Sequence, residues 1–594
     1  MCGINGFNFK NIELLKKMSK ITASRGPDNE GFFFNENFSV GHNRLSIIDV
    51  EKRSNQPLRF NDLIISFNGE IYNYLDLKKQ LQDLGYFFDT NSDTEVIIKL
   101  FDKYKLESFK MLSGIFAISI YDTLNDKIYL VRDVVGVKPI YYYFDKFSKK
   151  FYFSSLIKSL LLCKKSNEIN LDAIKSYSNF NRNDLRETYF KGIFKVLPGE
   201  VIEVSKNNFL RKKLIALKPQ KDANTEHLKK DINSIFSRQF LSDVPVALSL
   251  SGGIDSNIIF HELLKKLGSN FSCYSVTFEN SDKYKIDHDV AKEISKKYGV
   301  KFNTVMATYN DFQDRAEDIV DIVEEPVGNT NSVANLILSE SVKEKVFFSG
   351  DGGDEVFTGY NKYRSILILS IINKLNFLNF KDFKFNSKIF KRLFIKNSRQ
   401  LYLSFSEQNL FKSQKKIYNN FEFFNEDDLN ETLNNSLNIN NEPNLSNVMY
   451  HDLDTWVVND ILLRNDKIYS NKGIEARVPF LDKDLITNYL MASDLKKYGF
   501  FFKSKKILKN SYNKELKYTL KKKSGFNTPF AGWLREGLFE FAKKILSKEY
   551  YNSSELINFD ECEKLLKKHK KNYYDPFLIW NVINLQIFLR KFKI

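Results

Sequence analysis

The chain has 594 residues, of which 43% are hydrophobic, and it carries a net charge of +17. A chain of this length exceeds what one hydrophobic core supports, so at least two domains are expected. No run of 18 apolar residues predicts a membrane span, and the N-terminus lacks the basic and apolar regions of a signal peptide. The histidines show no metal-ligand spacing and no Cys-x-x-Cys pair occurs, which argues against a structural zinc site.

The positive charge leaves nucleic-acid binding open as an alternative function. The lysines are spread throughout the chain, however, so we predict no nucleic-acid partner. The four cysteines are too few and too scattered for a disulfide framework, which favours a reducing compartment. We therefore predict a cytoplasmic protein with no membrane partner.

We predict that residues 1–205 form a strand-rich first domain. Short apolar runs bounded by polar or glycine residues predict strands at 64–67, 115–120, 127–131 and 201–204. Helical stretches are predicted between them, at 75–84 and 94–104. Residues 206–228 are polar and rich in lysine, so we interpret them as a linker.

From residue 229 to residue 594 the pattern changes. Alternating elements are predicted, with strands at 244–250, 272–278 and 346–348 and helices at 257–267 and 290–298. This alternation is typical of a doubly wound parallel α/β sheet. Residues 365–450 are rich in Asn, Lys and Phe, lack a chemical motif and predict a helical insertion.

Cys2 directly follows the initiator methionine. If Met1 is removed, one residue carries a thiol and a free α-amine, whose pKa near ~8 is low enough for it to act as a base. Such a thiol needs no separate histidine to become a thiolate nucleophile. An isolated Met-Cys pair would be an accident, so the prediction depends on the surrounding motifs. A retained Met1 should abolish this chemistry.

Four polar signatures occupy loop-like positions in the first domain. They are Arg25-Gly26-Pro27-Asp28, residues 41–49, residues 67–73 and Ser92-Asp93-Thr94-Glu95. Each is weak when taken singly, since Asn-Gly is usually a turn. Together they supply what a thiolate needs to attack the amide of an amino-acid substrate.

The chemistry of that attack assigns roles to residues of three of these signatures. The Asn68 side chain and the Gly69 backbone N–H are natural donors to the oxyanion that forms on the attacked carbonyl. Arg44 can bind the substrate carboxylate through two hydrogen bonds. Glu70 and Asp93 can hold the substrate ammonium group.

This half of the chain resembles the glutaminase domain of class II glutamine amidotransferases, which use an N-terminal cysteine. The resemblance implies a four-layer α/β/β/α sandwich of the N-terminal nucleophile type and glutamine as a substrate. It also implies a set of glutamine-binding residues: Arg44, Leu45, Ile48, Asn68, Glu70 and Asp93. Residues 131–142 resemble a late segment of that domain, which we interpret as structural and lining the domain interface.

A glycine-rich turn at 250–256 follows one predicted strand and opens a helix. Its N–H groups and the helix N-terminus form an anion cradle. It lacks the Gly-Lys-Ser/Thr ending of the P-loop. It resembles the pyrophosphate loop of enzymes that cleave ATP to AMP and pyrophosphate, which makes Asp255 a candidate Mg²⁺ ligand.

A second acidic turn at 349–357 follows the strand predicted at 346–348. It could be an ordinary turn, but two Asp beside three Gly after an apolar strand suit metal or substrate binding better. By resemblance, Asp354 is a second Mg²⁺ ligand and Asp351 lies near the acceptor as a catalytic residue. The ATP-binding residues implied by resemblance are Leu250, Ser251, Gly252, Gly253, Asp255, Ser256, Val276, Ser349 and Gly350.

Residues 462–467, 473–482 and 521–529 resemble the asparagine synthetase domain. Lys523 precedes Gly525-Phe526 and is our candidate for neutralising charge on pyrophosphate and on the adenylated intermediate. The run of lysines could equally be a solvated surface. The resemblance implies an ATP pyrophosphatase fold for 229–594.

The whole chain resembles glutamine-hydrolysing asparagine synthetases, which implies a γ-glutamyl thioester on Cys2, an internal ammonia tunnel and ATP with Mg²⁺ at the second site. Residues 467–471 and 357–360 depart from the family pattern near the expected acceptor pocket. The acceptor therefore stays open between aspartate and another carboxylate, such as a sugar uronic acid of surface-polysaccharide biosynthesis. A homodimer is also compatible with the sequence.

Overall fold

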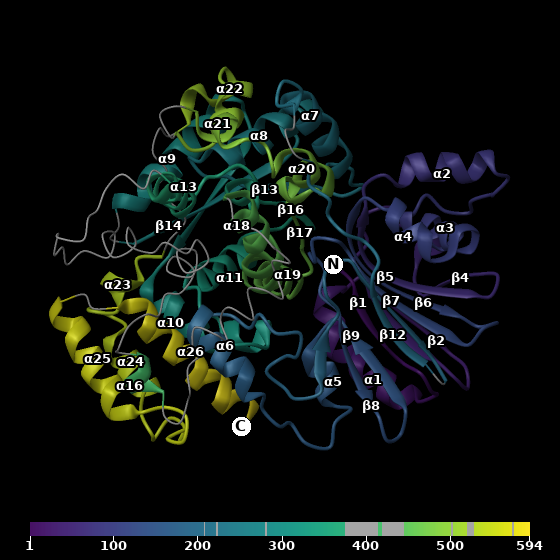
Figure 1. The fold of residues 1–594 in the computed structure, drawn as a ribbon, viewed down its shortest axis with the longest axis horizontal. Coiled ribbons are helices and arrows are strands. Elements are labelled where there is room, and N and C mark those ends of the chain that lie inside the picture. Colours follow the sequence, from purple (N-terminus) through teal and green to yellow (C-terminus); the bar gives the residue numbers. More distant parts are fainter. Residues whose placement is uncertain are drawn as a thin grey trace.

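The computed structural model describes residues 1–206, 208–220, 224–279, 282–374, 414–418, 445–499, 503–519, 528–572 and 575–593. Two bodies lie side by side, a strand-rich N-terminal domain and a larger, mainly helical C-terminal domain (Figure 1). Lys523 and most of the predicted insertion at 365–450 lie outside the described residues. Within the described ranges, every helix is too short or too polar to cross a bilayer.

The N-terminal domain contains two six-stranded antiparallel sheets. In spatial order, the first sheet consists of β10 (Ile193–Lys195), β8 (Tyr141–Asp145), β9 (Lys150–Ser154), β1 (Gly3–Phe7), β3 (Ser39–Arg44) and β2 (Asn29–Phe34). The second consists of β12 (Asn208–Lys213), β11 (Glu200–Ser205), β7 (Lys127–Arg132), β6 (Gly114–Asp122), β5 (Leu63–Ile71) and β4 (Leu58–Phe60).

Helices cover the outer faces of both sheets. On the first sheet lie α1 (Ile12–Thr22) and α5 (Ile157–Leu161), and on the second lie α2 (Tyr74–Asp83) and α3 (Asp93–Tyr104). Between the sheets, side chains such as Ile4 and Ile64 are fully buried in a shared core. The predicted four-layer α/β/β/α sandwich is confirmed, as are the strands and helices predicted within it. The domain also contains α4 (Ser108–Met111) and α6 (Leu171–Phe180).

The predicted linker at 206–228 was partly wrong, because it contains β12. This strand pairs with β11 over its whole length, from Ser205 opposite Asn208 to Glu200 opposite Lys213. Its side chains are mostly exposed because it is the edge strand of the sheet. Lysines are typical of edge strands, where their charge opposes pairing with other chains. The polar composition therefore indicated an edge strand here.

The C-terminal domain is built on a five-stranded parallel sheet. Its order is β15 (Lys301–Ala307), β14 (Ser272–Phe278), β13 (Val246–Ser249), β16 (Val346–Phe348) and β17 (Glu475–Arg477). The strand order reverses between β13 and β16, so the loops after these two strands flank the position where ligands bind in open α/β sheets.

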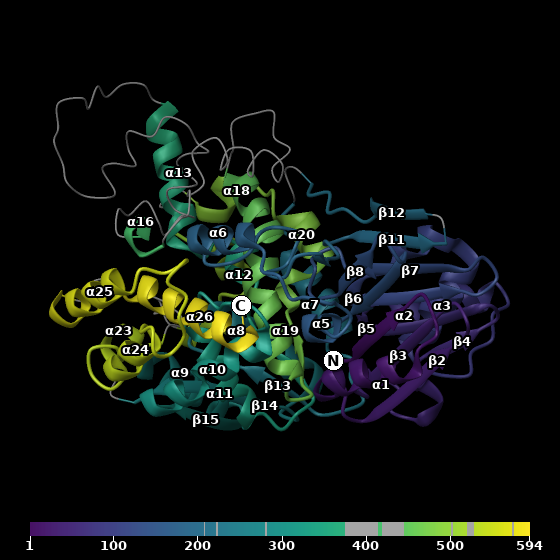
Figure 2. The same cartoon turned by 90° about the horizontal axis from the view of Figure 1, so that it is seen from below.

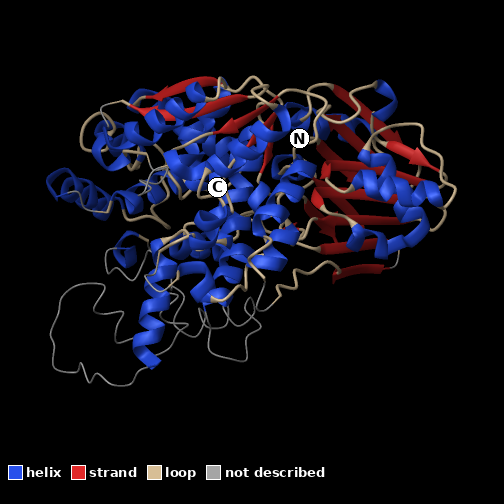
Figure 3. Ribbon diagram, turned by 90° about the horizontal axis from the view of Figure 1, so that it is seen from above, coloured by secondary structure: helices blue, strands red, loops and turns tan. Residues whose placement is uncertain are grey.

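Helices pack on both faces of this sheet, as the doubly wound prediction requires. One face carries α7 (Leu228–Gln239), α8 (Ile254–Leu267) and α9 (Asp282–Lys297), and the other carries α10 (Tyr309–Val323) and α11 (Asn331–Ser341). Leu248 and Ala247 show the alternation, since they belong to the cores on opposite faces. Figure 3 shows these strands surrounded by helices, at the opposite end of the molecule from the antiparallel sheets.

The remaining helices of the C-terminal domain complete its two cores. Those nearest the switch point and the domain interface are α12 (Gly353–Val356), α13 (Asn361–Lys374), α18 (Leu445–Asp452), the π-helix η5 (Leu453–Leu462), α19 (Leu463–Ser470) and α20 (Lys483–Tyr489). The others are α16 (Gln414–Ile417), α21 (Asp494–Tyr498), α22 (Lys506–Ser511), α23 (Phe530–Trp533), α24 (Phe539–Ile545), α25 (Phe559–Asn572) and α26 (Pro576–Phe592). Figures 1 and 2 both place α19 between the domains.

Candidate functional site

Cys2 lies buried at the start of β1, where three strands converge. Its backbone N–H donates to Asn68 Oδ1 on β5 at 2.8 Å, and its Sγ accepts a hydrogen bond from the N–H of Leu45, just after β3, at 3.5 Å. Burial raises the pKa of the Cys2 thiol, and the nearby N-terminal ammonium acts in the opposite direction. The pairing of β1 with β3 and the packing of β1 against β5 of the other sheet therefore bring together the predicted nucleophile, Leu45 and Asn68.

Asn68 is oriented so that its amide nitrogen is available. Its Oδ1 accepts the hydrogen bond from Cys2, whereas its Nδ2 is buried and has no hydrogen-bond partner among the described residues. A buried, unpaired donor beside a thiol is what an oxyanion site requires. The neighbouring Gly69 has φ of 142°, and a Cβ there would lie 1.9 Å from the Ile115 carbonyl oxygen, so only glycine fits.

Arg44 is held by the backbone that follows β3. Its Nη1 donates to Glu51 O at 2.9 Å and to Asn55 Oδ1 at 2.8 Å, while Nη2 donates to Asp49 O at 2.5 Å and to Ile48 O at 3.4 Å. Four of the five guanidinium donors are thus engaged within the described residues. Only Nε and the Nη2 proton that makes the long bond to Ile48 O are left for a substrate carboxylate. The predicted two-bond contact would therefore use the Nε–Nη2 edge of the guanidinium.

Glu70 and Asp93 form a buried acidic pair. Asp93 Oδ2 accepts from the N–H of Ile71 at 3.0 Å, and burial raises the pKa of Asp93 to about 7. Burial, reinforced by the charge of Glu475, raises the pKa of Glu70 well above its usual range. Arg477 on β17 of the other domain lies 3.3 Å from Glu70. This pair suits a substrate ammonium, and Arg477 is a neighbour that sequence reasoning did not identify.

Met1 is buried against the same cluster. Its amine has a pKa lowered to about 6, chiefly by burial. With Met1 attached, the Cys2 nitrogen is an amide and cannot accept a proton. Removal of Met1 would convert the same nitrogen, already hydrogen-bonded to Asn68, into the basic amine that the predicted mechanism uses.

The predicted nucleotide loop connects β13 to α8 at the switch point. Ser251 N–H donates to Ser256 Oγ at 3.1 Å, and Gly253 N–H donates to Ser251 Oγ at 3.2 Å. Asn257 Nδ2 donates to the carbonyl oxygens of Ser251, at 2.9 Å, and Gly253, at 2.6 Å. Asn257 thus binds the carbonyl oxygens of the loop, while two loop N–H groups donate to the hydroxyls of Ser251 and Ser256. A phosphate could replace these hydroxyls as the acceptor. Sequence reasoning did not identify Asn257.

The two acidic turns are in direct contact. A Cβ on Gly353 would lie 2.4 Å from Asp255 Oδ1, and one on Gly350 would lie 3.0 Å from Asp255 Cβ. Glycine at these two positions therefore allows the turns after β13 and β16 to touch. Leu250 and Val276 lie at the carboxyl ends of β13 and β14, at the same edge of the sheet. The structure brings the predicted ATP-binding residues together.

Lys505 lies between the two predicted metal ligands. Its Nζ contacts Asp255 Oδ2 and Asp354 Oδ1, and all three side chains are at least nine-tenths buried. Two carboxylates that share one ammonium also fit Mg²⁺, with phosphate oxygens and water as its remaining ligands. Among the described residues, no group of three or more His, Cys, Asp and Glu side chains could hold a metal.

Asp351 points away from that pair. Its Oδ2 accepts from Asn465 Nδ2 and from Ser349 Oγ, each at 2.8 Å. Asn335 Nδ2 in turn donates to Asn465 Oδ1 at 3.1 Å, which fixes the Asn465 amide. Asp351 therefore faces α19, and its carboxylate is positioned by two donors.

Helix α19 contacts both sites through consecutive residues. Asn465 binds Asp351, and Asp466 pairs with Arg25 Nη1 at 2.9 Å. Arg25 Nε donates to the carbonyl oxygen of Cys2 at 3.0 Å. Lys138 Nζ also lies 3.9 Å from Asp466, so residues 131–142 line the domain interface as predicted. The thiol site and the acidic turns are thus joined through one helix.

Comparison with known proteins identifies both halves of the chain. Residues 1–214 match the glutamine amidotransferase domain family, and residues 227–590, more than half of the chain, match the asparagine synthase family. The chain belongs to the asparagine synthase family. It is therefore an ATP-dependent ligase that acts on small-molecule substrates such as glutamine and ATP.

Relatives cover the chain at low identity. It is 29% identical to asparagine synthetase [glutamine-hydrolyzing] 1 of Bacillus subtilis, over 99% of this chain and 97% of the relative. It is 31% identical to amidase chry2 of Gibberella zeae, over 61% of this chain and 57% of the relative. Among solved structures, glutamine phosphoribosylpyrophosphate amidotransferase of B. subtilis is 14% identical over 51% of this chain and 66% of that chain, with a TM-score of 0.28.

Two departures from the asparagine synthase pattern have visible structural roles. Lys467 is fully buried and donates to Glu324 Oε2 at 2.8 Å and to Val323 O at 2.7 Å. Glu324 also accepts from the N–H groups of Ile157 and Lys158 at the start of α5, so this pair joins the domains. In the other departing segment, Thr358 has φ of 61°, a conformation that favours glycine.

Proposed function

We propose that this protein is a glutamine-dependent asparagine synthetase. The Cys2 thiolate attacks the side-chain amide of glutamine, and Asn68 Nδ2 and Gly69 N–H stabilise the oxyanion. The tetrahedral adduct loses ammonia to leave a γ-glutamyl thioester, which water hydrolyses to glutamate. Arg44 binds the glutamine carboxylate, and Glu70 and Asp93 bind its ammonium group.

At the second site, the loop N–H groups of Ser251 and Gly253 bind the pyrophosphate portion of ATP. The aspartate β-carboxylate attacks the α-phosphorus, pyrophosphate leaves, and ammonia then displaces AMP to give asparagine. Asp255 and Asp354 would hold Mg²⁺, which when bound neutralises phosphate charge. Lys505 would then be free to move toward the phosphates. Lys523 stays a candidate for neutralising the charge of pyrophosphate and of the adenylated intermediate.

One observation carries the proposal. Helix α19 binds Asp351 through Asn465 and reaches the Cys2 backbone through Asp466 and Arg25. A site that frees ammonia and a site that consumes it gain from such proximity, because ammonia released inside the interface is not lost to water. This supports the predicted internal tunnel between the domains.

The test is a product balance. Wild-type protein given glutamine, ATP, Mg²⁺ and aspartate should form glutamate, AMP, pyrophosphate and asparagine in equal amounts. Ammonium chloride should replace glutamine, while omission of aspartate should prevent AMP formation. Glutamine hydrolysis without any aspartate-dependent AMP would refute the asparagine assignment and leave the glutaminase assignment standing.

We also propose a cytoplasmic location, which the free thiols of all four cysteines support. The predicted homodimer stays a proposal that light scattering of the purified protein tests: a mass near twice the 69.6 kDa of the chain is expected.

A further inference from the structure

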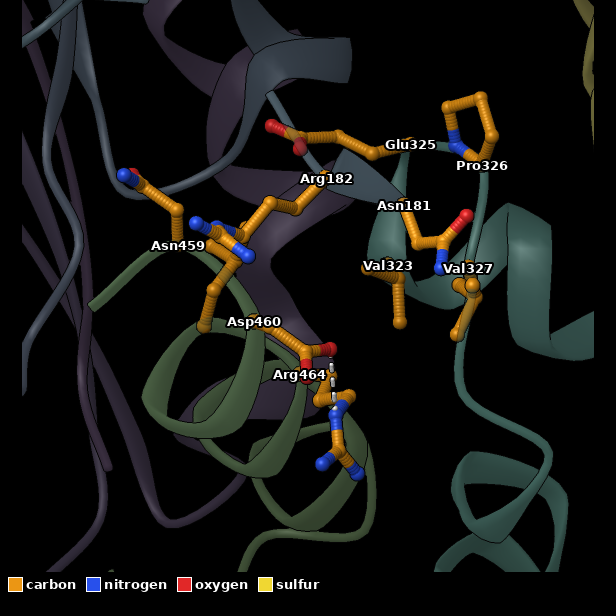
Figure 4. A pocket seen from close by; sticks show the side chains of 11 residues that line it. Asn181, Arg182, Val323, Glu325, Pro326, Val327, Asn459, Asp460 and Arg464 are labelled. Atoms are coloured by element: carbon orange, nitrogen blue, oxygen red, sulfur yellow. Dashed lines mark hydrogen bonds and ion pairs between the residues drawn. The ribbon is translucent and has the colours of Figure 1, made fainter. Parts of the chain in front are cut away.

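Two pockets adjoin the π-helix η5. In the first, between η5, the end of α6 and the segment after α10, Arg464 is paired with Asp460, as the dashed line in Figure 4 shows. The second is lined by Leu453, Asp454 and Val458 of η5 and has an empty volume of about 350 Å³. Small-molecule sites in proteins have volumes of about 300–1,000 Å³, so the second pocket suits one small ligand.

The walls of this second pocket, here called the connection pocket, come from both domains and from the chain between them. Val134 and Val135 belong to the N-terminal domain, whereas η5, α18 and α20 belong to the C-terminal domain. Lys213 is the last residue of β12, and Leu217 lies in the chain that leads to the second domain. A ligand in this pocket would therefore contact all three parts of the molecule.

Backbone hydrogen bonds hold the connecting chain against both domains. The carbonyl oxygen of Gly199 accepts from the N–H groups of Leu214 and Ile215, each at 3.0 Å. Further along, the N–H of Gln220 donates to the carbonyl oxygen of Thr487 on α20 at 2.8 Å. The wall that contains Leu217 is thus fixed on both sides, so the connection pocket is part of the folded structure.

Two opposite charges line the connection pocket without pairing with each other. Among the described residues, neither the Asp454 carboxylate nor the Lys213 ammonium has a hydrogen bond or an ion pair. Burial raises the pKa of the Asp454 carboxyl, and the charge of Lys213, which is exposed to solvent, acts in the opposite direction. A carboxylate withdrawn from water gains free energy from a cationic partner, so Asp454 favours a ligand with an ammonium group.

The rest of the lining is mostly apolar. Val134, Leu217 and Tyr450 are only partly buried, so they keep apolar surface that a ligand can cover. A phosphate would meet the negative charge of Asp454, and a sugar would bury its hydroxyls against these side chains. A molecule with an ammonium, a carboxylate and an aliphatic group matches all three features of the lining.

We propose that the connection pocket binds a free α-amino acid with an aliphatic side chain, its ammonium on Asp454 and its carboxylate on Lys213. The proposal goes beyond the proposed function, because none of the lining residues is assigned to the glutamine site or to the ATP site. Such a ligand binds only while the domains are docked, so its binding stabilises the docked arrangement. The pocket is then a regulatory site, separate from both reaction centres.

Leucine and three analogues test the proposal on the full-length wild type by isothermal titration calorimetry. Leucine should bind saturably, with one molecule per chain, and should raise the melting temperature. The analogue 4-methylpentanoate lacks the ammonium, 3-methylbutylamine lacks the carboxylate and glycine lacks the side chain. Loss of the ammonium should weaken binding by about 10- to 100-fold, the value of a charge-assisted hydrogen bond. Absence of leucine binding would overturn the proposal, as would equal binding of 4-methylpentanoate.

Variants of the two charged residues locate the site. Asp454→Asn should weaken leucine binding by about 10- to 100-fold, and Lys213→Gln by about two- to fivefold, because exposed charges are screened by solvent. The matched control is Lys212→Gln, since the side chains of consecutive residues on a strand point to opposite faces, and it should bind leucine like the wild type. Glutaminase activity without leucine reports whether each variant has folded. Unchanged leucine binding in Asp454→Asn would overturn the assignment.

A competition experiment separates the connection pocket from the substrate sites. Leucine should bind equally well to Cys2→Ala protein that has been saturated with glutamine and aspartate, because this variant does not consume glutamine. Displacement of leucine by either substrate would place it at a reaction centre and overturn the proposal. The proposed asparagine synthesis is measured independently, by product balance without leucine, so the two conclusions can fail separately.

Discussion

The two sites differ in what positions their side chains. At the glutaminase site, Cys2 at the start of β1 and Asn68 on β5 belong to the two different sheets, so the packing of one sheet on the other sets their 2.8 Å contact. At the synthetase site, Asp255 and Asp354 lie on loops after parallel strands, and a lysine from a distant segment balances their charge. The contacts of the first site are set by the fold, whereas in the proposed mechanism the second site exchanges one cation, the Lys505 ammonium, for another, Mg²⁺.

The largest expected effect tests the independence of the two sites. Cys2→Ala should lower the rate of glutamine hydrolysis on the order of 10⁴-fold, because no other group replaces the nucleophile. Amide formation from ammonium chloride should persist at the wild-type rate. An assay of AMP release with each nitrogen donor checks this, and an equal loss with both donors would show that the sites do not act separately.

The second prediction concerns the charge balance of the synthetase site. Lys505→Met should lower the free energy of unfolding of the ligand-free C-terminal domain by about 3–5 kcal/mol, because it leaves two buried carboxylates facing each other. Mg²⁺ with ATP should raise the melting temperature of this variant more than that of the wild type, since no ammonium has to be displaced. Lys509→Met, on the helix α22 that Lys505 precedes, is the control, because Lys509 donates to the Ser504 carbonyl. Equal ligand-induced shifts would contradict the exchange.

The third prediction separates two roles of Asn68. Asn68→Asp keeps an oxygen for the Cys2 nitrogen and loses the unpaired N–H donor. Glutamine hydrolysis should fall by about 10²- to 10³-fold, the cost of one oxyanion donor. Single-turnover kinetics locate the loss in thioester formation. A variant that forms the thioester at the wild-type rate would remove Asn68 from the oxyanion site.

The smallest effect is a pH dependence. Because the pKa of Asp93 is about 7, the carboxylate becomes protonated below that pH and loses its attraction for the glutamine ammonium. We expect kcat/KM for glutamine to fall about tenfold per pH unit below 7, and Asp93→Asn to flatten the profile. The raised pKa also means that Asp93 favours folding below its ordinary pKa and that this contribution is lost as pH rises through 7. A wild-type profile of kcat/KM that is flat from pH 5 to 8 would exclude Asp93 as a ligand of the glutamine ammonium group.

Sequence reasoning identified the fold and the motif residues because local patterns encode them. The strands are short apolar runs. The glycine-rich turns that follow β13 and β16 can be recognised from consecutive residues of the sequence. Lys505 was missed because it lies 250 residues from Asp255 and carries no local signature. Arg477 was missed as a neighbour of Glu70 because the contact exists only once the domains pack together.

The π-helix before α19 sets the direction of every contact that α19 makes. Over Leu453–Leu462 the chain winds with i→i+5 hydrogen bonds and so with more residues per turn than an α-helix. Deleting one residue there would rotate α19 by roughly 100° about its axis. Asn465 and Asp466 would then lose their contacts with Asp351 and Arg25 together. The length of this one segment therefore sets the rotation of α19, on which its contacts with both proposed sites depend together.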